Sequence, residues 1–459
     1  MTQVCRSWRN TLIATPSLWT NINFRNYQQV MMFLGRSRDQ PLNVFQYHTD
    51  SPDQDSTKRV VSATLSNIHR LRSLKVVSDS FQLEWVLAQF TKSAPDLNHL
   101  TITSDPDVPY GEKTLPNTIF EGQLPKLTSL KLRYLCSDLC SFNFPSLTRF
   151  HFTTKTITTA HDLTSFFERC PLLETVEISL RYLPQPPDSP PPNKRVRLPA
   201  LKELELDRVA CVTGLLDHLI LPRRAELTLR GQFMGEEYDQ FGYAAPQIHP
   251  SSIGHLLVMT GITKAVAMPD SCIFSGSNGD LRFWCCDGIR EDFNAEYFCS
   301  FSPIPVLGIR ELWVGQRGDS TRRPSSWRQT TGGVLGAFKV LSKVEDLTIV
   351  RCEMEAFFTM LGSTTDDGIL LPGLRRLTIY VGVGDLNVGA LVQCAKARKE
   401  YFRPVDEVTV VLGRELDASF VQEMESLREF VGQLSCRVGE APNLNYNMED
   451  IPGREVGLR

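Results

Sequence analysis

The chain has 459 residues, with 49 basic and 52 acidic side chains and a formal net charge of −3. Its hydrophobic content of 42% is ordinary for a folded protein and excludes a wholly disordered chain. A charge this close to neutral gives no electrostatic footprint for nucleic acid or for an anionic membrane, so we expect neither as a partner. At this length we expect either several domains or one elongated repeat array.

Residues 1–20 lack the charged start and apolar core of a signal peptide. No apolar run reaches the roughly 18 residues that would cross a bilayer. The 12 cysteines are therefore expected as free thiols in a reducing compartment. We expect the protein in the cytoplasm, the nucleus or both.

The first predicted elements are two short helices in the stretch VCRSWRNTLIATPSLWTNI, residues 4–22. Val4, Trp8 and Leu12 recur every four residues and therefore share one face of a helix. The second element begins with Thr-Pro at 15–16, a helix N-cap followed by proline at the first helical position. It carries a second apolar group made of leucine and tryptophan. Such a segment is too small to be a domain alone.

A second pattern, with apolar residues at positions i, i+3 and i+5, recurs every 20 to 35 residues. Its fourteen units begin at Leu42, Leu71, Leu97, Leu127, Leu147, Leu173, Leu201, Arg224, Ile253, Leu281, Ile309, Val344, Leu374 and Val405. Proline stands two residues before seven of the fourteen units, where 28 prolines in 459 residues predict about one by chance. Proline cannot continue a preceding helix, and it favours an extended neighbour, so each such unit is predicted to begin a strand.

Residues with helical spacing lie between these strands. The predicted helices cover 27–34, 81–90, 162–170, 214–219, 333–341, 354–361 and 389–401. Each unit then consists of a helix, a turn and a short strand, and stacked units bury a continuous core. Positions i+3 and i+5 face that core, while i+4 lies on the opposite, concave face. Residues 231–300 fit least well, so the units at Ile253 and Leu281 are the weakest members.

Two segments depart from the repeat. Residues 183–197 carry six prolines and are expected to form an extended loop, either a spacer or a ligand of the polyproline type. After the last unit, we expect a helical cap over residues 413–440 and a coil tail over 441–459.

Candidate chemistry is sparse. Gly382 and Gly384 match the first two glycines of a dinucleotide-binding loop, but Asn387 occupies the third position, so a plain strand-to-helix turn is the alternative. Neither the cysteines at 136 and 140 nor those at 285 and 286 have a second pair at metal-binding spacing. No catalytic motif is present. We therefore expect no enzyme activity, no cofactor and no metal site.

The repeat resembles the leucine-rich repeat family over roughly residues 40–412. The family's Asn or Cys at the ninth position appears in full only in the unit at Val344, where Cys352 holds it. The resemblance implies an α/β fold, an irregular leucine-rich-repeat solenoid or horseshoe. Its concave face would hold a protein partner. Trp313 is the aromatic residue that we expect there, either as a partner-binding anchor or packed against a neighbouring loop.

The N-terminal segment resembles the second half of an F-box of the fungal type. The residues that agree in order are Val4, Cys5, Arg6, Trp8, Arg9, Pro16, Leu18 and Trp19. An unrelated pair of amphipathic helices is the alternative. The first half, with its Leu-Pro-x-Glu start, would precede Met1. On this view residues 1–24 are a partial F-box and residues 25–412 are a divergent repeat array.

This resemblance implies a substrate-receptor subunit of a cullin–RING (SCF-type) ubiquitin ligase. It would dock the ligase adaptor through the F-box and hold a target protein on the repeats. The implied adaptor-binding residues are Val4, Cys5, Trp8, Leu12, Leu18 and Trp19. The alternative is a leucine-rich-repeat binding scaffold that has lost adaptor docking.

Overall fold

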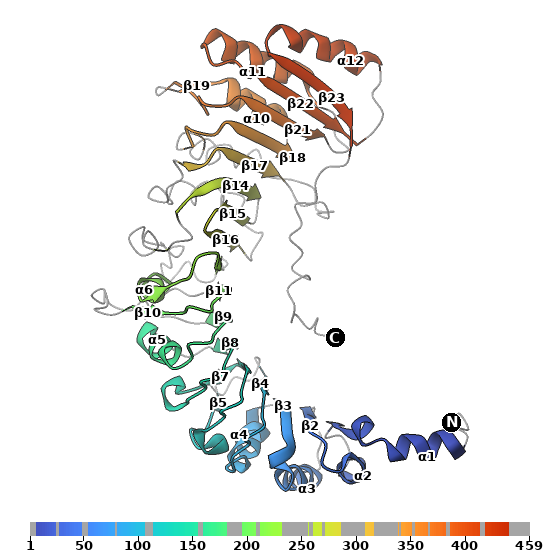
Figure 1. Ribbon diagram of the computed structural model, residues 1–459. Coiled ribbons are helices and arrows are strands. Elements are labelled where there is room, and N and C mark those ends of the chain that lie inside the picture. The colour runs from blue at the N-terminus through green and yellow to red at the C-terminus, as the bar shows by residue number, and fades with distance from the viewer. Residues whose placement is uncertain are drawn as a thin grey trace. The chain divides into compact units, whose positions relative to one another are not determined.

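The protein is described here from a computed structural model. It describes residues 6–23, 27–47, 54–78, 80–105, 113–154, 159–180, 195–207, 212–231, 256, 260–268, 271–285, 308–315, 338, 341–350, 354–365, 368–381, 386–413 and 418–439. The chain divides into two compact units, Met1–Ala225 and Glu226–Arg459. Both combine helices with mostly parallel strands, which confirms the predicted α/β class (Figure 1).

The first unit contains a parallel ladder in which consecutive main strands are neighbours. Its strands, in ladder order, are β1 (Asn21–Asn23), β2 (Leu42–Tyr47), β3 (Leu71–Ser78), β4 (His99–Ser104), β6 (Ser129–Arg133), β8 (Arg149–Thr154), β9 (Thr175–Leu180) and β11 (Glu203–Asp207). Two short parallel pairs lie outside it: β5 (Lys113–Thr114) with β7 (Leu135–Cys136), and β10 (Val196–Arg197) with β12 (Leu219–Ile220). The predicted proline-rich loop falls largely on residues outside the described ranges, and β10 forms its C-terminal end.

Helical segments connect the strands of this unit. They are α1 (Arg6–Ala14), η1 (Pro16–Trp19), α2 (Tyr27–Ser37), α3 (Gln54–Leu65), η2 (Ile68–Arg70), α4 (Ser80–Gln89), η3 (Ile119–Gly122), η4 (Leu139–Ser141), α5 (Ala160–Glu168) and α6 (Val212–Asp217). Helices α3 to α6 lie along one side of the ladder (Figure 1). We call the opposite side of each ladder its open face.

The strands bury alternate residues between the ladder and the helices. In β6, Leu130 and Leu132 are buried while Lys131 is only half-buried, and β8 repeats this with Phe150 and Phe152. These are the predicted i+3 and i+5 positions. Each fully buried side chain of this size contributes about 1.5–3 kcal/mol relative to exposure. The i+4 residues consequently lie on the open face, as predicted.

The prolines occupy a recurring tight turn just before the strands. The amide of Leu97 donates a hydrogen bond to the carbonyl of Ala94 (3.1 Å), which places Pro95 second in a four-residue turn. Equivalent bonds place prolines 125, 145, 171, 199 and 372 in the same position. Proline suits this position because its ring pre-sets the backbone angle that the turn requires. Pro222 differs, because it is the first residue of its turn.

The first repeat unit has a different register from the one that the pattern predicts. Val44 of β2 is buried beside Leu74 of β3, whereas Phe45 pairs with Lys75 and is 42% exposed. The predicted core residue Phe45 therefore lies on the open face. Val44 and Phe45 are both apolar, so the sequence alone fits a core that takes either of them. A shift of one residue exchanges the two faces of a strand.

The second unit contains a ladder with two antiparallel hairpins at one end. Its strands, in ladder order, are β13 (Glu226–Gly231), β16 (Gly279–Cys285), β15 (Ser271–Gly276), β14 (Ile262–Met268), β17 (Glu311–Gly315), β18 (Asp346–Val350), β21 (Arg376–Val381), β22 (Glu407–Leu412) and β23 (Gln433–Val438). The pairings of β15 with β14 and with β16 are antiparallel, and the others are parallel.

The hairpins lie in the stretch where the predicted repeat is least regular. Leu281 of β16 pairs with Leu227 of β13, so it occupies the i+3 position and not the start of a unit. The strand that joins the parallel ladder here is β14, whose buried Ala265 pairs with Leu312. Alanine is too small to contribute to a leucine-rich pattern, which explains why the sequence does not predict this strand.

The remaining elements of the second unit are α10 (Met354–Gly362), the short pair β19 (Thr364–Thr365) and β20 (Gly368–Ile369), α11 (Val388–Glu400), α12 (Ala418–Glu425) and η8 (Ser426–Glu429). Within residues 413–440, β23 follows the helices and extends the ladder by one strand beyond β22. No helix in the described parts of the chain is long and apolar enough to cross a membrane.

Candidate protein-docking sites

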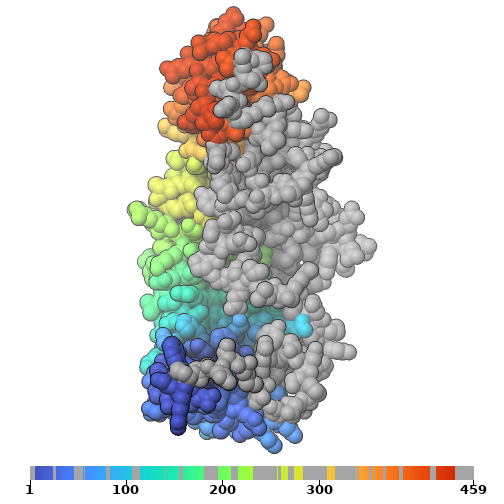
Figure 2. Space-filling view, turned by 90° about the vertical axis from the view of Figure 1, so that its right-hand side faces the viewer, coloured from blue at the N-terminus to red at the C-terminus, as the bar shows by residue number. Residues whose placement is uncertain are grey.

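Helix α1 presents an apolar face that the described structure leaves uncovered. None of its nine residues is buried. Trp8 is 67% exposed, Leu12 38% and Ile13 41%, and Leu18 in the following turn is 53% exposed. The helix projects away from the ladder in Figure 1, and its dark blue atoms lie at the surface in Figure 2. An exposed tryptophan and leucine on one helix face are typical of a docking site.

The rest of this segment is firmly attached. The ring of Trp19 packs edge to face on Phe33 of α2, with centroids 5.0 Å apart, and the guanidinium of Arg36 lies 4.4 Å from its centroid. Its indole nitrogen donates a hydrogen bond to the carbonyl of Leu12 (2.9 Å). Ile22 is buried in β1, which pairs with β2. The end of α1 is therefore tied to the ladder.

The six residues implied by the resemblance divide into three groups. Trp8, Leu12 and Leu18 are exposed, Trp19 packs inward, and Val4 and Cys5 lie outside the described residues. Helix α2 adds two exposed residues that were not predicted, Met31 (45%) and Met32 (39%). Their helical spacing did not distinguish them from core residues.

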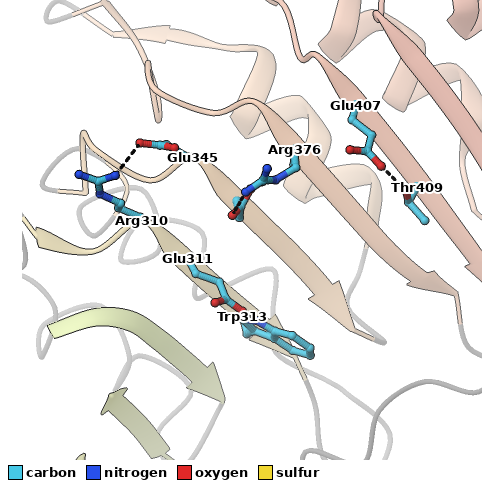
Figure 3. Close-up of polar contacts among 8 residues, drawn as sticks. Arg310, Glu311, Trp313, Glu345, Arg376, Glu407 and Thr409 are labelled. Carbon is cyan, nitrogen blue, oxygen red and sulfur yellow. Dashed lines mark hydrogen bonds and ion pairs between the residues drawn. The ribbon is translucent and has the colours of Figure 1, made fainter. Parts of the chain in front are cut away.

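A second candidate surface lies on the open face of the second unit, around Trp313 (Figure 3). Trp313 is half-buried against a small apolar cluster that includes Val266 and Val350. The ammonium group of Lys264 lies 4.4 Å from its ring centroid and pairs with Glu311 at 3.0 Å. The indole nitrogen donates a hydrogen bond to the same carboxylate. The ring is thereby held in place with one part accessible.

Charged and hydroxyl side chains continue across the neighbouring strands. Strand pairing places Asp346 beside Arg376, and the guanidinium donates two hydrogen bonds to that carboxylate. This raises the pKa of Arg376. These charged residues form one row across the strands, and hydroxyl residues form a second row beside it. In the second row, the hydroxyl of Thr409 lies 3.4 Å from the Glu407 carboxylate and 2.9 Å from the Ser435 hydroxyl. The charged row was not predicted, because its residues stand at i+2 of their units and the predicted surface comprised only the i+4 positions.

The hollow between these rows has a volume of about 200 Å³. That is smaller than the roughly 300–1,000 Å³ of most small-molecule sites. Its lining residues include Glu311, Asp346, Arg376, Glu407 and three threonines. A shallow polar surface with one half-buried tryptophan suits contact with another macromolecule better than enclosure of a substrate.

A further hollow of about 530 Å³ lies where the strands of the second unit begin. Its lining residues include Arg310, Lys343, Arg375 and Phe402. Phe402 follows α11 with a left-handed backbone (φ 58°) and is 90% exposed. Glycine is the usual residue at this position after a helix.

The described residues also bear on the candidate chemistry. Among them, no group of three or more His, Cys, Asp or Glu side chains is arranged to hold a metal ion. Gly382 and Gly384 lie outside the described ranges. Asn387, at the third position of that pattern, caps α11 by accepting a hydrogen bond from the amide of Ala390 (2.9 Å).

The cysteines with described side chains are free thiols, at positions 136, 170, 394 and 436. Burial raises the pKa of Cys170 to about 12 and that of Cys394 to about 11. Both therefore remain protonated near neutral pH and are poor nucleophiles.

Comparison with known proteins does not assign the chain to a family. A scan against protein-family models found no match, and a search of curated proteins found none.

Proposed function

We propose that the protein is a non-enzymatic interaction subunit, the substrate receptor of a cullin–RING (SCF-type) ubiquitin ligase. The exposed face of α1 docks the ligase adaptor, and an open face of the ladders holds a target protein. The transfer chemistry belongs to other subunits. The observation that carries this proposal is the exposed apolar face of α1 beside a firmly packed Trp19.

Physical reasoning supports docking through this face. Tryptophan and leucine side chains left in water forgo about 1.5–3 kcal/mol each relative to burial, so their exposure on an ordered helix favours a partner. The attachment of η1 to α2 holds the C-terminal end of α1 in place, and preorganisation lowers the entropy cost of binding. The resemblance to the second half of an F-box favours a ligase adaptor as the partner.

The ladder supports the second part of the proposal. Strands recur at the period of the sequence repeat, and the six that follow a turn with proline in second position all bury positions i+3 and i+5. This arrangement favours an irregular leucine-rich-repeat solenoid. In such folds the extended face opposite the helices is well suited to a protein partner. Free thiols at the described cysteines support a reducing compartment, the cytoplasm or the nucleus.

The test is a pull-down of the purified ligase adaptor by this chain and by a chain extended upstream through any in-frame coding sequence. We expect at least one chain to bind the adaptor and Trp8→Ala to abolish binding. Exposed Arg149 lies elsewhere, so Arg149→Ala is the control. If neither chain binds the adaptor, ligase function is wrong and the ligase-independent scaffold replaces it.

A further inference from the structure

The open face of the first unit separates positive from negative charge across neighbouring strands. On β3, β4, β6 and β8 its charged positions are Lys75, Lys131, Arg133 and Arg149, with no Asp or Glu. On β9 and β11 they are Glu177, Glu203, Glu205 and Asp207, with no Lys or Arg. The near-neutral charge of the whole chain conceals this division.

The two blocks meet at His151 of β8. Its Nδ1 lies 2.5 Å from a carboxylate oxygen of Glu177 on β9. Arg133 donates a hydrogen bond from Nε to the His151 Nε2 (3.0 Å). Because arginine only donates, Nε2 must accept, and the ring proton lies on Nδ1 facing Glu177. A neutral histidine therefore links the last basic strands to the first acidic strand.

The pKa shifts of two neighbouring groups agree with this separation of positive and negative charge. Burial lowers the pKa of His99, and the nearby positive charges of Arg72 and Arg149 lower it further. Burial alone would raise the pKa of Glu177. Its net shift is nevertheless downward, because of the hydrogen bond with His151 and the positive charges of Lys131 and Arg133.

The spacing of the strands indicates how long a bound polypeptide segment would be. With neighbouring strands about 4.8 Å apart, the basic strands span about 14 Å and all six strands about 24 Å. An extended polypeptide at about 3.3 Å per residue would cross them with about seven or eight residues. A nucleic acid would carry its negative charge onward over β9 and β11, where the four carboxylates repel it.

We propose that this face binds an extended polypeptide segment in which an acidic stretch is followed or preceded by a basic stretch. The acidic residues lie over β3 to β8 and the basic residues over β9 and β11. This inference rests on the proposed function and deepens it by naming the chemistry of the target. Complementary charge blocks also suppress binding of segments whose acidic and basic residues are not separated into two stretches.

Fluorescence anisotropy with the full-length chain at low salt tests the inference. The probes are a labelled peptide of four glutamates followed by four lysines, and a peptide of the same composition in which the two residues alternate. We expect the block peptide to bind at least about tenfold more tightly, with affinity falling as salt rises. Equal affinity for the two peptides, or no binding of the block peptide, would overturn the inference.

Charge reversals then locate the site. Lys131→Glu should weaken binding of the block peptide about tenfold, because it replaces attraction by repulsion. Arg149→Glu, at an exposed position, is a second variant in case the half-buried Lys131 affects folding. The control is Lys126→Glu, which changes the net charge equally but lies outside the open face. An equal loss with the control, or tighter binding of a single-stranded oligonucleotide, would contradict a peptide site.

Adaptor binding measured on the same samples separates the two proposals. Lys131→Glu and Arg149→Glu should retain adaptor binding through α1. If wild-type protein binds the adaptor but not the block peptide, only the present inference fails. If it binds the block peptide but not the adaptor, ligase function fails and the charged face remains a binding site.

Discussion

Trp19 packs its ring edge to face on Phe33, with centroids 5.0 Å apart, while Trp8 in the preceding helix remains 67% exposed. Two tryptophans in one short segment therefore have different roles. Trp19 attaches the segment to α2, and Trp8 is available to a partner. Their substitutions should separate stability from binding.

We predict that Trp19→Ala lowers the free energy of unfolding by about 2 kcal/mol, less than a fully buried tryptophan because its ring is half-buried. Trp8→Ala should change the free energy by no more than about 0.5 kcal/mol, because the side chain is exposed. Urea denaturation measures both. Equal destabilisation by the two substitutions would show that Trp8 packs within the chain.

Arg398 of α11 is fully buried without an acidic partner among the described residues, and it binds backbone carbonyls instead. Its guanidinium donates hydrogen bonds to the carbonyls of Leu370 and Leu371, each at 2.8 Å, and to Leu361 at 3.4 Å. These bonds connect α11 to the end of α10 and the turn before β21.

Arg398→Ala should destabilise the protein by about 3 kcal/mol, because it leaves buried carbonyls unpaired and opens a cavity. Arg398→Lys should cost less, since an ammonium group retains some of the donors. The exposed Arg375 is the matched control, and its replacement by alanine should shift the urea midpoint little. A small effect of Arg398→Ala would contradict the role of these bonds.

Phe402 adopts a left-handed backbone at the end of α11, where its amide bonds to the carbonyl of Lys399 (3.0 Å). Phe402→Gly should stabilise the protein by up to about 1 kcal/mol, because glycine adopts this conformation without strain. Differential scanning calorimetry measures the gain. A lower melting temperature would show that the exposed ring contributes packing that outweighs the strain.

Two lowered pKa values, that of His151 and that of Glu177, predict a loss of stability in acid. Burial lowers the pKa of His151 from its ordinary 6.5, and Lys131 and Arg133 lower it further against the opposing effect of Glu177. The unfolded state therefore binds more protons as pH falls below 6.5, and stability falls with it. The lowered pKa of Glu177 acts in the same direction at more acidic pH.

His151→Gln should flatten the decline in unfolding free energy between about pH 7 and about pH 5.5, because the amide does not titrate there. The reference is the unsubstituted chain, measured over the same pH range. Chemical denaturation across this range measures both profiles. An unchanged slope in His151→Gln would place the titrating group elsewhere.

The repeat could be predicted because its features are local. In six units a turn with proline in second position precedes a strand with two buried positions, so short-range patterns identify Leu130 and Leu132 as core residues. The prediction that Phe45 is a core residue was wrong, because Val44 beside it is equally apolar. Only the pairing with β3 decides which of the two is buried. Strand β14 could not be predicted because Ala265 carries no leucine-like signal.

The charged surfaces depend on register, which lies beyond local patterns. Lys131, His151 and Glu177 are separated by 20 and 26 residues in sequence, yet parallel pairing makes them neighbours. The same holds for Asp346 and Arg376 in the second unit. The open-face position of Trp313 was predictable from its unit, but its contacts with Lys264 and Val266 were not.

The central claim is that the face of α1 docks a ligase adaptor, and amide hydrogen exchange with and without the purified adaptor tests it most directly. The account predicts slower exchange in residues 6–19 when the adaptor is added, with β21 and β22 unchanged. Trp8→Ala should remove this protection. Adaptor-induced protection that is absent from residues 6–19, or confined to the ladder, would contradict the account.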